Sequence, residues 1–344
     1  MMPPEPEPGI PPAHLETMSD LLRRFGWERA GEPVRVAQSV QNTNYRVETP
    51  DGTRFVRCYQ PSRTRERIER EHAVTRWAGE RGIPVAPALA DGTGRTVFSI
   101  GGRQWAVFPW VEGRSLLRGT MTAREAGVLG AMNGRLHRVL ADWPVGDLHR
   151  NSELSWDTEK SIADLSRVDD LIRYYPAQTE EQLQVQGWLR DQMEILEGGA
   201  ARPATDFAAI PVQPCHGDPH ERNLMVDAAG EPVAVVDWER FCLNPPAFEV
   251  LRTLTFARLL DEPLLTAFLA GYRTENRLAA ETLGPCVEFW WQCQLNNTWT
   301  YRDRFIKGNR ALDQFFEEGA DALRRFSDAG YRTGLAETLH REAS

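Results

Sequence analysis

Polar side chains with the equipment for phosphoryl transfer lie close together between residues 216 and 237. His216-Gly217-Asp218 is followed by Asn223 after four intervening residues, and Asp237 ends an apolar run. A carboxylate can accept a hydroxyl proton, while an amide oxygen and another carboxylate can hold Mg²⁺ against nucleotide phosphates. This pattern predicts transfer of a phosphoryl group from a nucleotide to a hydroxyl group.

A β-hairpin is expected to position these groups. Residues 224–226 and 233–236 have the composition of two short strands, and a turn ending in glycine separates them. Such a hairpin would return Asp237 to the end at which Asn223 lies. The loop that carries Asp218 runs directly into the hairpin.

These motifs resemble those of the aminoglycoside phosphotransferases and their homoserine- and choline-kinase-like relatives. The resemblance rests on His216-Gly217-Asp218 with Asn223 and on Val236-Asp237-Trp238-Glu239, with weaker landmarks from about Val34 to about Leu260. It implies an α+β, protein-kinase-like two-lobe fold, with a small antiparallel sheet lobe and a larger, mainly helical lobe. The resemblance implies that Asp218 is the catalytic base or orients the acceptor hydroxyl, and that Asn223 and Asp237 bind magnesium. Glu239 would support this magnesium ion or bind a second metal ion. His216 would support the loop that carries Asp218.

Composition favours a cytoplasmic protein with reduced cysteines. The chain has 344 residues, enough for two lobes, and no apolar run long enough for a membrane span. Its five cysteines form no Cys-x-x-Cys pair, and residues 1–12 lack the features of a secretory signal. A net charge of −9 disfavours a nucleic-acid partner and is compatible with a cationic acceptor.

Patterns along the chain predict four regions. Residues 1–33 are expected to form a tail and lead-in helix, 34–108 the nucleotide-binding sheet lobe, 109–113 a hinge, and 114–344 the helical catalytic and substrate lobe. Strands are predicted at 34–40, 45–49, 54–59, 96–100 and 104–108, the last two joined by Gly101-Gly102. Helices are predicted at 64–80, 122–140, 157–175, 180–196, 246–260, 263–275 and 281–305, and a loop at 198–214. Thr122 and Glu125 are expected to form a capping box at the start of the second of these helices.

The phosphate-binding cation is expected to be an arginine. Kinases of this kind place a lysine on the third strand, where this chain has Arg57. A guanidinium group stays protonated and can bind phosphate oxygens in a bidentate way. Glu69 and Glu71 compete as its partner, and helical spacing places Glu71 on the inward apolar stripe. A purely structural Arg57–Glu71 salt bridge is the alternative.

Further nucleotide contacts follow mainly from the resemblance. The turn at 39–44 lies where a phosphate loop would sit but has no glycine, so Ser39 and Asn42 are expected to contact phosphate. A plain hairpin turn is the alternative. The segment 108–113 resembles an adenine-binding hinge, in which Pro109 would offer its carbonyl and Val111 its N–H. An ordinary strand-to-helix connection is the alternative.

Acceptor-binding residues are expected in the helical lobe. His220, Glu221 and Arg222 lie in the Asp218 loop, and Trp290 belongs to a segment rich in aromatic and amide side chains. Core packing is the favoured interpretation of this aromatic segment, and acceptor binding by Trp290 is the alternative. Relatives have an aspartate at the position of Glu249, where it anchors the catalytic loop through backbone N–H groups, and Glu249 can accept the same bonds.

The sequence thus predicts an ATP- and Mg²⁺-dependent phosphotransferase acting on a hydroxyl-bearing small molecule, with Asp218 as the base. The acceptor would be an amino alcohol, an aminoglycoside or a sugar-like compound. A protein Ser/Thr kinase of the stress-response type and a nucleotide-binding pseudokinase are the alternatives. The choice between ATP and GTP and the oligomeric state stay open.

Overall fold

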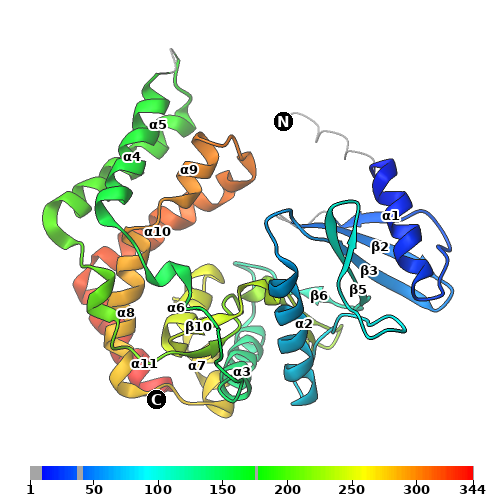
Figure 1. Ribbon diagram of the computed structural model, residues 1–344. Coiled ribbons are helices and arrows are strands. Elements are labelled where there is room, and N and C mark those ends of the chain that lie inside the picture. Colours follow the sequence, from blue (N-terminus) through cyan, green and yellow to red (C-terminus); the bar gives the residue numbers. More distant parts are fainter. Residues whose placement is uncertain (1–9, 37–41, 175–176, 344) are drawn as a thin grey trace. The chain divides into compact units, whose positions relative to one another are not determined.

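Contacts in the computed structural model divide the chain into two units. Unit 1 comprises Met1–Arg114 and Met225–Glu239, and unit 2 comprises Ser115–Leu224 and Arg240–Ser344. The structure describes residues 10–36, 42–174 and 177–343. The predicted α+β two-lobe class is confirmed, with a sheet-rich unit 1 and a mainly helical unit 2 (Figure 1).

Unit 1 is built on a five-stranded antiparallel sheet with the order β1-β2-β3-β5-β4. Gly101 and Gly102 join β4 to β5 with φ values of 58° and 71°, the left-handed backbone of the predicted two-residue hairpin. The strands are β1 (Val34–Val36), β2 (Thr43–Thr49), β3 (Gly52–Cys58), β4 (Phe98–Ile100) and β5 (Arg103–Pro109), and the helices are α1 (Pro12–Arg23) and α2 (Arg65–Glu80).

The two faces of this sheet carry different cores because side chains alternate along each strand. One face packs against α1, and its cluster joins Met18 and Leu22 to Val56 and Trp105. The opposite face packs Ala106 of β5 against α2. Arg57 pairs with Ala106 in the β3–β5 register, so the predicted phosphate-binding cation lies on the α2 face.

The hairpin after the catalytic loop groups with unit 1, whereas the sequence-based boundary puts it in the helical lobe. The physical reason is a backbone contact: Val235 N–H donates to the Pro84 carbonyl at 2.7 Å, and Val85 and Val235 form a parallel bridge. A three-stranded sheet contains β6 (Arg114–Ser115), β8 (Leu224–Val226) and β9 (Pro232–Val235).

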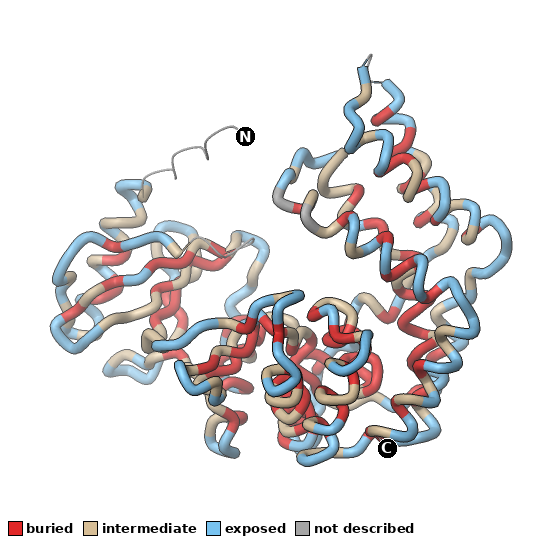
Figure 2. The backbone as a smooth tube through the Cα atoms, turned by 180° about the vertical axis from the view of Figure 1, so that it is seen from behind, coloured by how far each residue is buried: buried red, intermediate tan, exposed pale blue. Residues whose placement is uncertain are grey.

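Unit 2 consists mainly of helices with buried inner faces (Figure 2). The predicted capping box of Thr122 and Glu125 begins α3. A short antiparallel pair, β7 (Gln213–Cys215) and β10 (Cys242–Asn244), replaces the end of the predicted loop at 198–214. The helices are α3 (Ala123–Leu140), α4 (Thr158–Arg173), α5 (Glu180–Ile195), α6 (Pro246–Phe256), α7 (Leu264–Glu275), α8 (Ala280–Leu295), α9 (Trp299–Phe305), α10 (Phe316–Ser327) and α11 (Ala329–Ala343).

The helix predicted at 281–305 is wrong as a single element, because it is broken into α8 and α9. Side chains from the preceding helices satisfy the carbonyl groups at the break. Gln192 of α5 donates to Leu295 O at 2.8 Å and to Asn297 O at 3.2 Å, and Ser161 of α4 donates to Asn296 O at 3.1 Å. These bonds let α8 end without leaving its last carbonyls unpaired. None of the helices in the described ranges is long and apolar enough to cross a membrane.

Candidate active site

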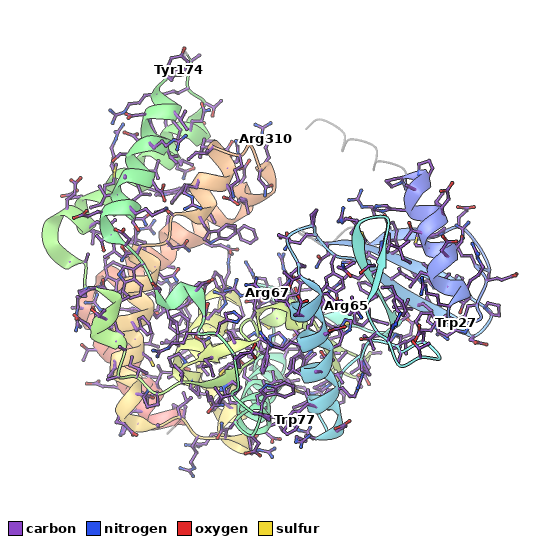
Figure 3. The ribbon with its side chains drawn as sticks, viewed as in Figure 1. Trp27, Arg65, Arg67, Trp77, Tyr174 and Arg310 are labelled. Carbon is purple, nitrogen blue, oxygen red and sulfur yellow. The ribbon has the colours of Figure 1, made fainter. Side chains whose placement is uncertain are left out.

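Arg57 is the centre of a buried ion network in unit 1. Its guanidinium Nη1 lies 3.5 Å from Glu71 Oε1 and 3.3 Å from Glu239 Oε1, and its Nε donates to Asn44 Oδ1 at 3.2 Å. The β2–β3 register places Asn44 directly opposite Arg57. Arg65 lies on the exposed side of α2 (Figure 3), and Glu69 pairs with it. The structure therefore selects Glu71 of the two predicted partners.

Glu239 is held by nitrogen donors from several parts of unit 1. Arg63 Nη2 binds its Oε2 at 2.6 Å and its backbone carbonyl at 2.9 Å. The Asn42 side-chain amide also donates to Oε1, which Arg57 contacts. Both carboxylate oxygens of Glu239 are therefore engaged by protein donors, which fits a supporting role for this residue.

Acids outnumber bases in this network. Burial would lower the pKa of Arg57, but Tyr59 and the carboxylates of Glu71, Asp237 and Glu239 raise it. Burial raises the pKa of Glu71, and Glu239 and Asp237 raise it further, against the opposing effect of Arg57. Three carboxyl groups, those of Glu71, Asp237 and Glu239, accompany the two guanidinium groups of Arg57 and Arg63, and the raised pKa of Glu71 lets this carboxyl group take up a proton and offset the surplus of acids.

The remaining predicted nucleotide residues have different surroundings. Asn42 Oδ1 accepts a hydrogen bond from Gln60 N at 3.0 Å, and Pro109 is the last residue of β5, where it pairs with Arg54. Val111 follows in an irregular segment of unit 1. Ser39 lies outside the described residues.

Asp237 is exposed and has a φ of 62°, in the left-handed region that non-glycine residues seldom adopt. Its carboxylate suits a hard divalent cation such as Mg²⁺, which prefers oxygen ligands. Strained backbone of this kind is often found at functional sites.

In unit 2, the loop carrying Asp218 is anchored from behind by Glu249. Glu249 Oε1 accepts a hydrogen bond from Gly217 N at 2.6 Å, and its Oε2 lies 2.8 Å from His137 Nε2. A Cβ atom at Gly217 would lie 2.1 Å from the Arg240 carbonyl oxygen, and the φ of Gly217 is 89°, so glycine is required there. Asp218 N donates to His216 Nδ1 at 3.3 Å, and His216 is fully buried.

The carboxylate of Asp218 is fixed by a guanidinium group that the sequence analysis did not single out. Arg252 Nε donates to Asp218 Oδ1 at 2.9 Å, and its Nη1 donates to Glu153 Oε2 at 2.6 Å. Arg240 Nη2 binds the other oxygen of Glu153, also at 2.6 Å. Arg252 follows Glu249 by three positions on α6, so helical spacing could have identified it. Glu153 lies far away in the sequence and gave no such signal.

The electrostatics keep Asp218 ionised. Burial alone would raise the pKa of Asp218, but Arg252, His220 and Arg240 outweigh it and hold this pKa well below the usual value. Asn223 Nδ2 donates to the Asp218 carbonyl at 2.8 Å. That bond orients the amide, and its Oδ1 accepts no hydrogen bond from the residues described, so this oxygen fits a metal ligand.

A cavity of about 200 Å³ lies beside Asp218, within unit 2. His220 lines it, whereas Glu221 is fully buried and binds Arg118, and Arg222 is exposed. Trp290 is fully buried against Phe248 and does not line the cavity, so it belongs to the core. The lining residues are Arg118, Gln192, Asp218, His220, Arg252, Thr255, Phe256, Gln294, Asn297, Trp299, Thr300, Tyr301, Phe315, Glu318, Gly319, Ala322 and Leu323.

The sheet unit and the helical unit with its anchored acid loop define a protein of the kinase-like class. Solved structures support this fold. A spectinomycin phosphotransferase in complex with ADP and spectinomycin aligns with a TM-score of 0.63 at 13% identity, covering 95% of this chain and 98% of that one. An amicoumacin kinase in complex with AMP-PNP and Ca²⁺ gives 0.60 at 19% identity, covering 95% and 93%. An aminopropanol kinase gives 0.56 at 17% identity, covering 95% and 97%.

The chain belongs to the phosphotransferase enzyme family, whose profile matches residues 33–282. The family resemblance stated from the motifs is thus confirmed. Homoserine kinases of Brucella canis and Brucella abortus are 25% identical to it over 150 residues. That match covers 43% of this chain and 44% of the relatives, so it spans less than half of their length.

Proposed function

We propose that this protein transfers the γ-phosphoryl group of ATP to a hydroxyl group of a small molecule. The observation that carries the proposal is the Asp218 carboxylate, which Arg252 holds at 2.9 Å beside a cavity formed entirely by unit 2. A fixed, ionised carboxylate next to a cavity accepts a hydrogen bond from an acceptor hydroxyl and aims its oxygen at phosphorus. Because its pKa is low, Asp218 orients the hydroxyl and takes its proton only late in the transfer.

Unit 1 supplies the nucleotide side. Arg57 provides the positive charge for phosphate oxygens, and Glu71 and Glu239 hold its guanidinium in place. Asn42 and Ser39 are the proposed phosphate-loop contacts, and the Pro109 carbonyl with the Val111 N–H is the proposed adenine contact. ADP and AMP-PNP in the complexes of structural neighbours support nucleotide binding by this fold.

Magnesium is the proposed metal. Asp237 is the candidate carboxylate ligand of unit 1, and Asn223 Oδ1 is the candidate amide ligand of unit 2. When bound, Mg²⁺ supplies positive charge that neutralises the phosphates during transfer. Glu239 supports the arrangement through Arg57 and Arg63.

The proposal is tested with γ-labelled ATP, Mg²⁺ and a panel of amino alcohols, sugars and antibiotics. Wild type should label at least one compound, and Asp218→Asn should reduce the rate by ~10²–10⁴-fold. Asp206→Asn, an exposed aspartate of unit 2, is the matched control and should keep full activity. Label on a protein substrate alone would indicate a protein kinase, and Mg-ATP binding without any transfer would indicate a pseudokinase.

Nucleotide binding is tested separately by thermal unfolding. Mg-ATP at 100 times its Kd should stabilise wild type by about 2.7 kcal/mol. Arg57→Met should remove most of that stabilisation, whereas Arg67→Met, at an exposed position of α2, should retain it (Figure 3). Equal ATP responses of the two variants would contradict the role given to Arg57.

A further inference from the structure

The cavity beside Asp218 has no unpaired negative charge. Its second acid, Glu318, binds Arg118 Nη1 at 2.6 Å and Arg258 Nη2 at 3.1 Å. Arg118 Nε also binds Glu221, at 2.9 Å. Asp218 itself is paired with Arg252. Each acid that lines the cavity is thus already compensated by a guanidinium group.

The charges of the lining residues therefore sum to zero or above. Arg118 and Arg252 balance Asp218 and Glu318. His220 adds a positive charge when it is protonated. Burial would lower the pKa of His220, but Asp218 and Glu221 raise it to about 9, which favours the protonated ring. The backbone N–H of Arg222, however, donates to His220 Nδ1 at 3.2 Å, and this bond favours the neutral ring. With either form of His220, a cationic acceptor finds no surplus acid to neutralise it.

Neutral polar groups in the same wall lack protein partners. Tyr301 is only 6% exposed, yet its hydroxyl makes no hydrogen bond with any residue that the structure describes. Its ring is stacked on Phe316, with centroids 5.2 Å apart, which fixes its position. The Gln294 side-chain amide likewise makes no hydrogen bond within the described ranges. A hydroxyl and an amide that line a cavity without protein partners can donate hydrogen bonds to a ligand and accept them from it.

Aromatic side chains complete this wall. Trp299 is half-exposed at the start of α9, and Phe315 lies just before α10. Phe256 is covered by the Arg252 guanidinium, with 4.6 Å from its carbon to the ring centroid. The face of Phe256 is therefore already used by a protein cation. Trp299 offers a broad apolar surface to the carbon skeleton of a ligand.

From this balance of charges we infer the class of the acceptor: a hydroxyl compound without net positive charge, bound by the Tyr301 hydroxyl and the Gln294 amide. This inference rests on the proposed function. The bond between the γ-phosphorus and the bridging oxygen of ATP breaks, ADP leaves with the electron pair, and a new bond forms to the acceptor oxygen. The hydroxyl proton passes to Asp218 and then to solvent. A polycationic aminoglycoside is excluded as the preferred substrate.

The test uses pairs of compounds that differ in charge but little in shape. Suitable pairs are glucose with glucosamine, glycerol with 3-amino-1,2-propanediol, and an N-acetylated aminoglycoside with its free amine form. Binding to the full-length protein is measured by thermal shift and calorimetry, and transfer is measured with labelled ATP. In each pair that binds, the uncharged member should bind about tenfold more tightly, which corresponds to ~1.4 kcal/mol.

Variants of the wall identify the groups responsible. Tyr301→Phe should weaken binding of the uncharged member about 2- to 10-fold, the range for one lost hydrogen bond. Tyr174→Phe, at an exposed end of α4, is the matched control and should change nothing (Figure 3). Gln294→Glu adds one acid to the cavity and should shift the preference toward the cationic member.

Two outcomes separate this inference from the proposed function. If wild type prefers the cationic members in binding and in transfer, the inference fails while the phosphotransferase proposal stands. If the uncharged members bind preferentially but no label is transferred, the proposed function fails while the charge preference of the cavity stands. The absence of any binding by uncharged hydroxyl compounds, at concentrations where the cations bind, would also overturn the inference.

Discussion

Replacing Arg252 by glutamine should destabilise the protein and should do so most strongly at neutral pH. Arg252 is bound to both Asp218 and Glu153, and the pKa values of both acids are below their usual values because of it, although burial opposes this. Removal of one partner of a buried ion pair costs about 3–5 kcal/mol. The side chains of Asp218 and Glu153 are 17% and 32% exposed, so solvent screening reduces the expected loss to about 2–4 kcal/mol.

The pH dependence follows from the sign of these shifts. An acid whose pKa is lowered by folding stabilises the protein above its unfolded pKa, about 3.9 for Asp and 4.3 for Glu. That stabilisation disappears as the pH falls through the lower, folded pKa. In Arg252→Gln the two acids lose this contribution. The difference in free energy of unfolding between wild type and variant should therefore be greatest near pH 7 and shrink on acidification below about pH 4.

Urea unfolding at several pH values measures this difference. Arg258→Gln is the control, because Arg258 is exposed and its pairing with Glu318 should contribute only about 0–1 kcal/mol. Arg252→Lys restores the positive charge, but lysine cannot bind Asp218 and Glu153 through two separate nitrogen atoms. This variant should therefore recover only part of the lost free energy of unfolding. Equal losses for Arg252→Gln and Arg258→Gln, or a loss independent of pH, would refute the reasoning.

Two further predictions concern packing and the unit 1 network. In Gly271→Ala, the new Cβ would lie 2.0 Å from the Gly127 carbonyl oxygen, so α3 and α7 must separate and the free energy of unfolding in urea should fall by about 1–3 kcal/mol. Gly187→Ala is the control: it lies in α5 with open space around it and should be neutral or stabilising by up to ~1 kcal/mol. Equal effects of the two substitutions would contradict this account. The pKa of Glu71 is raised in the folded protein, so the stability of wild type should fall as the pH rises above about 4.3. Glu71→Gln lacks this titrating group and should become progressively more stable relative to wild type over that range. If the stabilities of the two proteins depend on pH in the same way, the raised pKa of Glu71 is refuted.

The sequence predicts best those features that depend on neighbouring residues. The Gly101-Gly102 hairpin and the Thr122 capping box depend on residues within a few positions of each other, and both are present. The inward position of Glu71 follows from helical spacing alone, and the structure has it buried and paired with Arg57. Local periodicity is sufficient in such cases because the geometry of one element decides the outcome.

Features that depend on distant residues were not predictable in this way. The bond from Arg118 to Glu221 joins positions 103 residues apart, and the bond from Arg252 to Glu153 joins positions 99 apart. The break between α8 and α9 likewise depends on Gln192, which lies 103 residues before Leu295. No local pattern carries this information, because the partners are brought together only by the packing of separate helices.

The break between α8 and α9 divides unit 2 into parts that can change independently. Gln192 and Ser161 hold the end of α8, and Asp164 of α4 pairs with Arg302 of α9, so α4 and α5 contribute to the placement of α9. Substitutions at Trp299 or Tyr301 share no hydrogen-bond partner with Glu249 or Gly217 among the bonds described, so their effects should be additive. New acceptor preferences can therefore evolve, or be engineered, by altering one short helix while the machinery of transfer is left intact.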